Sequence, residues 1–290
     1  MPNFFDPKRC FDNNGYDLEP FLNSLENETN LETCLDLGAV YRSGDGAPFN
    51  PIAAANWFLK AASLGSEKGA ILLGLLLLDG LDDPENGNSL DADLMEGLRW
   101  LIYAESITQD PIVSNLIALT YLYKVHDSEK GVKWLRKAAS GGHAQSALKL
   151  GYLYGYGEGV PKDIAESKKW FKLAADADDK EGVFMTGRLM VQSGITDKDA
   201  KAALSYFIRA AKLGHPLAGL MLGQAYFHGI GVQKSNKRAY AWFWLAHTQA
   251  DLPSKEGQYV SEVLDSLEKN LSSSDIDEAV NMAQRFREEA

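Results

Sequence analysis

The sequence predicts an all-α protein built as an α-solenoid, with about six helix-turn-helix repeats followed by a C-terminal pair of capping helices. Three observations support this fold class. A glycine recurs in the first helix of five of the six repeats, an aromatic residue recurs in the second helix, and apolar residues recur around both at spacings of three and four. The two anchors shift together along the chain, which indicates a true repeat rather than unrelated helices.

The first helix and its turn are clearest in residues 142–175. Ser146, Leu150 and Tyr154 recur at intervals of four, so they share one face of a helix. Gly151 lies on the same side, where a glycine costs roughly 1 kcal/mol relative to alanine. We therefore expect Gly151 to let a neighbouring helix approach closely. Glycines within residues 155–159 then permit a turn.

The second helix of the same repeat follows the turn. Pro161 has no N–H for a continuing helix, and Asp163 suits the N-cap of a new one. We expect an apolar stripe on the core side and lysines on the water side. The stripe consists of Ser167, Trp170, Phe171 and Ala174, and the lysines are Lys168, Lys169 and Lys172.

The two anchors set the repeat positions. The first-helix anchor is Gly38, Gly74, Thr120, Gly151, Gly187 and Gly223. The second-helix anchor is Trp57, Trp100, Trp134, Trp170, Tyr206 and Trp242. We expect repeats at about 31–66, 67–110, 111–142, 143–178, 179–214 and 215–250, in an array that spans 31–251. Because the tryptophans share one phase, we expect them in the core between helices rather than in a ladder that stacks a ligand.

The spacing within two segments resembles a known family. Residues 150–175 carry LG-x-L-Y-x-x-G-x-G-V followed by A-x-x-x-x-W-[FY]-x-x-A-A, and residues 222–246 follow the same pattern with departures at Ala225 and Lys237 and with His247 in place of the last alanine. This pattern resembles the Sel-1-like repeat, a tetratricopeptide-type (TPR-like) hairpin, over roughly three quarters of the chain. The resemblance implies a right-handed superhelix and roles as adaptors in signalling and secretion, or as proteins that neutralise a toxin or host factor.

Three repeats depart from this pattern. The second repeat lacks the glycine turn and carries extra residues at 82–88 between its helices. The third repeat has Thr120 at the glycine position and a shortened linker. The fifth repeat keeps Gly187 but replaces the turn with residues 193–196.

The two ends of the chain are expected to differ from the repeats. Residues 1–30 lack the repeat and the features of a signal peptide, and residues 17–27 suit one short capping helix. In the C-terminal part, 252–290, we expect a long helix over residues 253–271 that packs on the sixth repeat. Residues 274–277 suit a cap before a second, shorter helix over 279–289.

Composition and motifs argue against several function classes. With 29 basic and 40 acidic residues the net charge is −11, and no basic stripe indicates a nucleic-acid partner. No run of about 20 apolar residues predicts a membrane span. We expect a cytoplasmic monomer with Cys10 and Cys34 reduced.

Motifs for chemistry are also missing. No P-loop, G-x-S-x-G, H-E-x-x-H or paired CxxC is present, so we expect no enzyme, catalytic residue, cofactor or metal site. Residues 155–159 are interpreted as a repeat turn rather than a phosphate loop. The acidic residues 82–85 are interpreted as a solvated loop rather than a calcium site. His143 and His215 share one repeat position and are interpreted as turn residues rather than ligands.

What remains is the face of the first helices that varies between repeats. Positions −2, +1 and +5 from the glycine anchor share one face, opposite the stripe, which we expect to form the concave surface. Its candidate partner-binding residues are Tyr121, Lys149, Tyr152, Tyr156, Met185, Arg188, Gln192, Met221, Gln224 and His228. Tyrosine, arginine and methionine are enriched at interface centres. As an alternative, Leu72, Leu75, Met185 and Met221 contact neighbouring first helices.

The leading functional hypothesis is a non-catalytic scaffold or adaptor that binds a peptide, helix or domain of another protein on this concave face. The alternative is a specific inhibitor or immunity-type protein that neutralises a toxin or enzyme, for which the charge of −11 would favour a basic partner. An enzyme is a remote third alternative, because no motif supports it.

Overall fold

The computed structural model describes residues 30–84, 87, 89–192, 196–249 and 254–288. Within these ranges all regular structure is helical, apart from one isolated antiparallel bridge between Leu81 and Leu90. The all-α prediction is confirmed. The capping helix expected at residues 17–27 lies outside the described residues.

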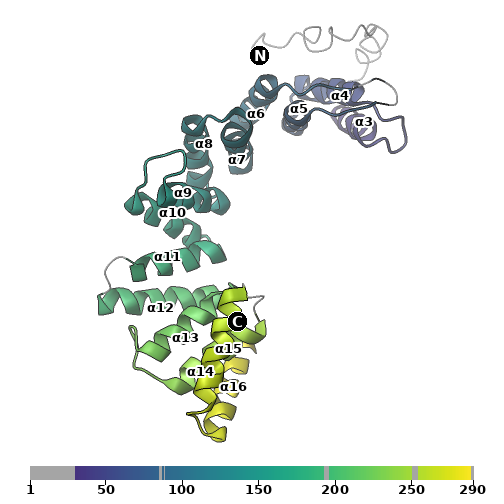
Figure 1. Cartoon of the computed structure of the whole chain (residues 1–290). Helices are drawn as coiled ribbons and strands as arrows, with labels where there is room; N and C mark the ends of the chain where they lie inside the picture. Colours follow the sequence, from purple (N-terminus) through teal and green to yellow (C-terminus); the bar gives the residue numbers. More distant parts are fainter. Residues whose placement is uncertain (1–29, 85–86, 88, 193–195, 250–253, 289–290) are drawn as a thin grey trace. The chain divides into compact units, whose positions relative to one another are not determined.

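The chain divides into two compact units between Ala138 and Ala139, inside helix α8. The described residues of the N-terminal unit form three helix pairs up to that point (Figure 1). Its elements are α3 (Leu31–Ser43), α4 (Pro51–Ser63), α5 (Glu67–Asp79), α6 (Leu94–Thr108), α7 (Pro111–Thr120), a π-helical turn η2 (Tyr121–Val125) and α8 (Ser128–Ser140).

The C-terminal unit contains three further pairs and a terminal pair. Its helices are α9 (Ala144–Tyr156), α10 (Ile164–Asp176), α11 (Lys180–Gln192), α12 (Asp197–Lys212), α13 (Ala218–His228), α14 (Asn236–Gln249), α15 (Ser254–Glu268) and α16 (Ser273–Glu288). Within a pair α9 packs on α10, α11 on α12 and α13 on α14, and successive pairs meet through α10 with α11 and α12 with α13. Each pair therefore buries its apolar stripe against the next.

The helix boundaries follow the predicted turn chemistry. Gly157, in the left-handed region at φ 81°, ends α9 and donates its N–H to Leu153. The Asp163 carboxylate accepts the N–H groups of Ala165 and Glu166 at the start of α10, so the predicted N-cap is confirmed. These caps set the length of the turn between the two helices of a repeat.

The recurring glycine creates the closest approach between the two helices of a repeat. A Cβ added at Gly151 would lie 2.6 Å from the ring of Phe171, and one at Gly223 would lie 2.7 Å from the ring of Phe243. Gly38, Gly74 and Gly187 face Phe58, Leu101 and Phe207 in the same way. The predicted role of Gly151 is confirmed, and no larger residue fits without displacing the second helix.

The third repeat reverses this arrangement. Thr120 occupies the glycine position and α7 ends there, with the hydroxyl of Thr120 donating to Leu116 O at 2.9 Å. The small residue instead comes from the second helix, because a Cβ at Gly131 would meet the side chain of Leu122 at 2.5 Å. The wide π-helical turn η2 places Leu122 over Gly131, so the close approach is kept with the roles exchanged.

The tryptophan anchors are less deeply buried than expected. Trp57 is buried, at 7% exposed, whereas the other four tryptophans, Trp100, Trp134, Trp170 and Trp242, are only half-buried. In each second helix the residue that follows the anchor is buried more deeply than the anchor itself. These residues are Phe58, Leu101, Leu135, Phe171, Phe207 and Phe243, all at most 4% exposed. Where the first-helix anchor is a glycine, the residue after the second-helix anchor faces that glycine and enters the core between the two helices. The aromatic anchor itself lies at the edge of this core.

The C-terminal pair packs on α14, whose neighbours are α15 and α16 (Figure 1). Val260, Leu264 and Leu267 of α15 are buried, as the spacing predicted. The start and length expected for the last helix were wrong. It begins at Ser273, because the Ser272 hydroxyl accepts the N–H of Asp275 and caps the helix there. It has 16 residues, one more than α15. The ring of Phe286 meets Trp242 edge-on, with centroids 4.6 Å apart.

The loop that contains Asp83 is less exposed than expected at that residue. Asp83, expected in a solvated loop, is only 3% exposed, and its N–H donates to Ser89 Oγ.

None of the helices in the described ranges combines the length and apolar character needed to cross a bilayer.

The glycine contact leads to a first prediction. Replacing Gly151 with alanine raises helix propensity by roughly 1 kcal/mol, but the added methyl group collides with the Phe171 ring. We expect a net loss of about 1 to 2 kcal/mol in the free energy of unfolding, measured by chemical denaturation.

The control is the same change in a background with a smaller residue opposite. In Phe171→Leu the collision is relieved, so Gly151→Ala should be neutral or stabilising there. An equal cost in both backgrounds would show that the glycine serves some purpose other than close approach.

Candidate functional site

The structure separates the predicted partner-binding residues by exposure. In the C-terminal unit, the exposed members are Tyr156, Arg188, Gln192 and His228, and the half-buried members are Lys149, Tyr152, Met221 and Gln224. We call these eight residues of α9, α11 and α13 the first-helix face. They supply aromatic, cationic and amide groups at the surface.

Two of the predicted residues do not reach the surface. Met185 is 6% exposed because it packs with Phe184 and Phe207 in the core of the C-terminal unit. Tyr121 of the N-terminal unit is 8% exposed, since it starts the π-helical turn η2 and packs among the apolar residues of α6 and α7. Neither side chain is available to a partner, and the prediction for both was wrong. The core cluster that contains Met185 includes residues of the neighbouring first helices α9 and α13, in line with the alternative of contact between first helices.

Tyrosines one helical turn apart form the aromatic part of the face. The rings of Tyr152 and Tyr156 are parallel, with centroids 5.9 Å apart. The ring of Phe171 packs edge-on against the ring of Tyr152, with centroids 5.0 Å apart. Tyr156 is 63% exposed, so much of its side chain is available to a partner. A flat ring fixed by a second ring loses little conformational freedom on binding.

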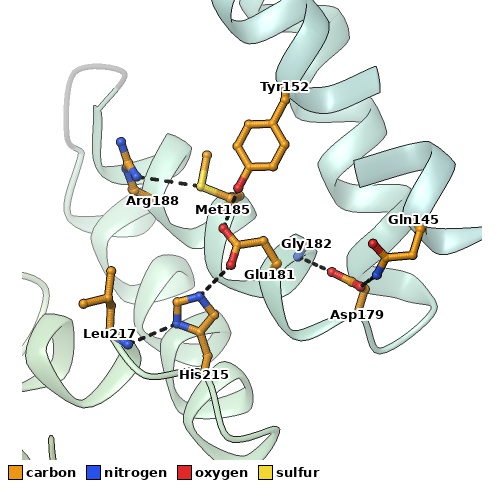
Figure 2. A network of polar contacts seen from close by, with 9 residues as sticks. All are labelled: Gln145, Tyr152, Asp179, Glu181, Gly182, Met185, Arg188, His215 and Leu217. Atoms are coloured by element: carbon orange, nitrogen blue, oxygen red, sulfur yellow. Dashed lines mark hydrogen bonds and ion pairs between the residues drawn. The ribbon is translucent and has the colours of Figure 1, made fainter. Parts of the chain in front are cut away.

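A chain of hydrogen bonds connects Tyr152 to the start of α13 (Figure 2). The Tyr152 hydroxyl donates to Glu181 Oε1 at 2.5 Å, and Glu181 Oε2 lies 2.9 Å from His215 Nε2. His215 Nδ1 accepts the N–H of Leu217 at 3.3 Å, so the proton of a neutral ring must lie on Nε2 and is donated to Glu181. The buried imidazole also stacks on Phe184, with centroids 3.9 Å apart. The network therefore links α9, α11 and α13.

The charges of the network favour an ionised carboxylate. The hydrogen bond from His215 is the main cause that lowers the pKa of Glu181 below the ordinary carboxyl value of 4.5, and the Tyr152 hydroxyl and Arg188 act in the same direction. Partial burial opposes this shift. Burial, followed by the hydrogen bond to Glu181, raises the pKa of Tyr152 well above its usual range. Tyr152 is therefore a neutral donor at neutral pH.

A similar side-chain hydrogen bond joins the first helices of the fourth and fifth repeats. Gln145 Nε2 donates to Asp179 Oδ2 at 2.6 Å, and Asp179 caps α11 by accepting the N–H of Gly182. Glu181 and His215 repeat the pair at the same separation along the chain. A first-turn residue of one repeat thus bonds a residue just before the next first helix, and this linkage holds successive first helices in register.

Sequence reasoning missed Glu181. It placed His143 and His215 at one turn position. In the structure His143 caps α9, since its Nδ1 accepts the N–H of Ser146, whereas His215 Nδ1 accepts the N–H of Leu217 just before α13. The available signal was that Gln145 and Glu181 also share one repeat position, two residues after a cap. That signal indicates a first-turn location but does not say which cap the side chain reaches.

A small cavity opens beside the face, between α11, α12 and α13. Its volume is about 110 Å³. Most of its wall is apolar, and Arg188, Gln192, Met221 and Gln224 of the first-helix face line it. The predicted residues of the fifth and sixth repeats therefore surround one hollow rather than a flat surface.

The polar network does not form a catalytic arrangement. Both oxygens of Glu181 and both ring nitrogens of His215 are engaged in bonds that hold helices together. In the part of the chain that the structure describes, no group of three or more His, Cys, Asp or Glu side chains is placed to hold a metal ion. What this surface can do is present aromatic, amide and guanidinium groups on rigid helices.

Helix pairs with a glycine opposite an aromatic residue, and a surface of variable first-helix residues, define a repeat protein of the TPR-like class. The chain belongs to the Sel1 repeat family. The family model matches residues 31–66, 122–143, 144–179, 181–215 and 216–246, which together cover more than half of the chain. It leaves 67–121 unmatched, where the second and third repeats depart from the pattern.

Curated relatives are named as regulators of an enzyme. The chitin synthase regulator SKT5 of Malassezia restricta is 32% identical over 166 residues, covering 54% of this chain and 12% of that protein. The protein of the same name from Saccharomyces cerevisiae is 28% identical over 162 residues, covering 52% of this chain and 23% of that protein. The chain thus matches less than a quarter of the length of either relative.

A solved structure supports the fold. The Sel1 repeat protein from Oxalobacter formigenes superposes with a TM-score of 0.58 at 24% identity, covering 87% of this chain and 77% of that one. This similarity establishes the α-solenoid class of the chain and carries no information about its partner.

The network leads to a second prediction, for Glu181→Gln. Because the pKa of Glu181 is lowered in the folded protein, its ionised form stabilises the fold above the ordinary carboxyl value of 4.5. That stabilisation is lost as pH falls through the folded-state pKa. We expect the variant to be less stable by about 1 kcal/mol at neutral pH, a value discounted because the Glu181 side chain is 37% exposed.

The measurement is chemical denaturation at neutral pH and at about pH 3.5, where most carboxylates are protonated. The difference between wild type and Glu181→Gln should shrink at the lower pH. Glu166→Gln, which removes an exposed ion pair with Lys169, is the matched control and should change stability by a few tenths of a kcal/mol at most. A difference for Glu181→Gln that does not depend on pH would contradict the network.

Proposed function

We propose that this protein is a non-catalytic adaptor that binds a segment or domain of another protein on the first-helix face. The observation that carries the proposal is that this face exposes rigid aromatic and cationic side chains that the stacking of repeats does not require. Tyr156 is 63% exposed, and Arg188 is exposed one repeat further along. Tyrosine and arginine are the residue types that most often dominate binding energy.

Tyr152 has a structural role as well as a place on the first-helix face. Its ring packs on Phe171 and its hydroxyl donates to Glu181, so this residue positions the face. Within the part of the chain that the structure describes, Tyr156 stacks on Tyr152 and Arg188 makes a weak contact with Met185 Sδ at 3.9 Å, so neither has a comparable structural role. A test of binding should therefore change Tyr156 and Arg188 and leave Tyr152 intact.

The names of the relatives suggest what the partner does. Two relatives are named as regulators of chitin synthase, and each aligns with about half of this chain. We propose that this chain likewise regulates or recruits an enzyme through its repeats. The cytoplasmic, monomeric state expected from the sequence stays a prediction, as does the concave shape of the binding surface.

The test is affinity capture from native lysate with the full chain, followed by mass spectrometry of the retained proteins. The variant Tyr156→Ala/Arg188→Ala loses one exposed aromatic residue and one cation from the first-helix face. Its matched control, Ile208→Ala/Lys172→Ala, loses one exposed apolar residue and one cation from second helices. All three proteins should melt at similar temperatures, because these side chains are exposed.

We expect a stoichiometric partner that the control retains and the face variant loses by about tenfold or more, as for residues at the centre of an interface. Equal capture by all three proteins would remove the first-helix face from the proposal. A captured enzyme whose activity is abolished by a very tight equimolar complex would instead support the inhibitor alternative.

A further inference from the structure

The cavity beside the first-helix face has the size of a single side chain. Its volume of about 110 Å³ is somewhat smaller than the engineered apolar cavity of about 150 Å³ that binds benzene. Val191, Leu204, Phe207 and Ile230 provide an apolar wall. A pocket of this size and lining accepts a leucine, isoleucine or methionine side chain, and it is too small for a drug-sized ligand.

The cavity is a built feature of the fifth and sixth repeats. Ile230 comes from the turn after α13, and Gly231 next to it has a positive φ of 68°. A Cβ at Gly231 would lie 2.7 Å from the backbone of Ala200 in α12. Only glycine allows the turn to approach α12 so closely, and this approach brings Ile230 over the cavity.

The rim of the cavity is cationic and amidic. Among the described residues of its lining, Arg188, Gln192 and Gln224 are polar and none is a carboxylate. Within the described residues no carboxylate lies within ion-pair distance of Arg188, whose hydrogen bond runs to Met185 Sδ (Figure 2). Glu181 lowers the local positive potential, but both of its oxygens are occupied by Tyr152 and His215. Arg188 therefore keeps its donors for a ligand.

We propose that this cavity binds a linear peptide segment of a partner protein, with one aliphatic side chain in the cavity and a neighbouring Asp or Glu paired with Arg188. The inference rests on the proposed function and names the chemistry of its partner. Charge complementarity selects this occupant: the protein carries −11 overall, yet the rim of this apolar cavity has a guanidinium and two amides. The amides of Gln192 and Gln224 provide donors and acceptors for the peptide backbone.

The rim and the cavity recognise different parts of the segment. The guanidinium recognises a carboxylate through two parallel hydrogen bonds, while the cavity beside it recognises shape and apolar surface. An acidic side chain one or two residues from the aliphatic one satisfies both. A basic segment with the same aliphatic residue would be repelled by Arg188 and is excluded as a partner.

The experiment selects peptides from a random linear library displayed on phage, with the immobilised full chain as target. Enriched sequences are then made as fluorescent peptides with both ends blocked, so that a terminal carboxylate cannot substitute for a side chain. Binding is measured by fluorescence anisotropy. We expect the enriched peptides to carry Asp or Glu next to Leu, Ile or Met.

Two variants test the two halves of the site. Ala225→Leu places an isobutyl group in the cavity without changing charge, and Arg188→Glu reverses the charge at the rim. Each should weaken binding about tenfold or more, because one anchor is lost. On Arg188→Glu, a peptide with Lys in place of its acidic residue should bind better than the original. Lys172→Glu, with the same change in net charge on α10, should bind like wild type.

Circular dichroism and thermal melting confirm that each variant is folded. If Ala225→Leu does not fold, Arg188→Glu and the charge-swapped peptide decide the outcome, because Arg188 is exposed. Enriched peptides without an acidic residue, or peptides that bind both variants at full affinity, would overturn the inference. If such peptides lose binding on Tyr156→Ala, the proposed function stands and only the cavity is excluded. A library that yields no peptide also overturns the inference, while the lysate capture decides the proposed function separately.

Discussion

Close contact between a helical glycine and an aromatic or leucine residue on the partner helix is the constraint on which the rest of the structure depends. Gly151 against Phe171 shows it most clearly, because no space for a Cβ is left between them. The contact sets the distance between the two helices of a repeat and directs the apolar stripe of each helix inward. Where Thr120 replaces the glycine, Gly131 restores the approach from the other helix. The small residue can thus change helices, but the close approach itself is retained.

The binding surface follows from this packing. Once the stripe of a first helix is committed to its partner helix, positions on the opposite side are free to vary, and in the C-terminal unit they carry Tyr156, Arg188 and Gln224. The bonds from Gln145 to Asp179 and from Glu181 to His215 keep consecutive first helices in register. The side chains of the surface are therefore held by polar groups that belong to the scaffold and not to the site. Rigid presentation lowers the entropy lost when a partner binds.

Spacing in the sequence was enough to predict the helices and most of the exposed face, since the face of a helix is determined by intervals of three and four residues. Spacing could not decide how deeply each side chain of the apolar stripe is buried. Trp170 and Phe171 both belong to the apolar stripe, and only the approach of α9 at Gly151 shows that the phenylalanine goes deepest. Met185 was misplaced because its exposure depends on how the adjoining helices pack. Glu181 was missed because its partner, His215, comes from the next repeat and is found only in three dimensions.

Hydroxyl-radical footprinting of the full chain with and without its captured partner tests most directly whether the first-helix face is the binding surface. The method reports the solvent exposure of individual side chains, and this chain has reactive residues on both kinds of helix. The account predicts that the partner protects Tyr156 and Met221, and leaves Ile208 on α12 and Met282 on α16 as reactive as in the free protein. Protection of Ile208 and Met282, with Tyr156 and Met221 unchanged, would place the partner on the other side of the helix pairs and contradict the account.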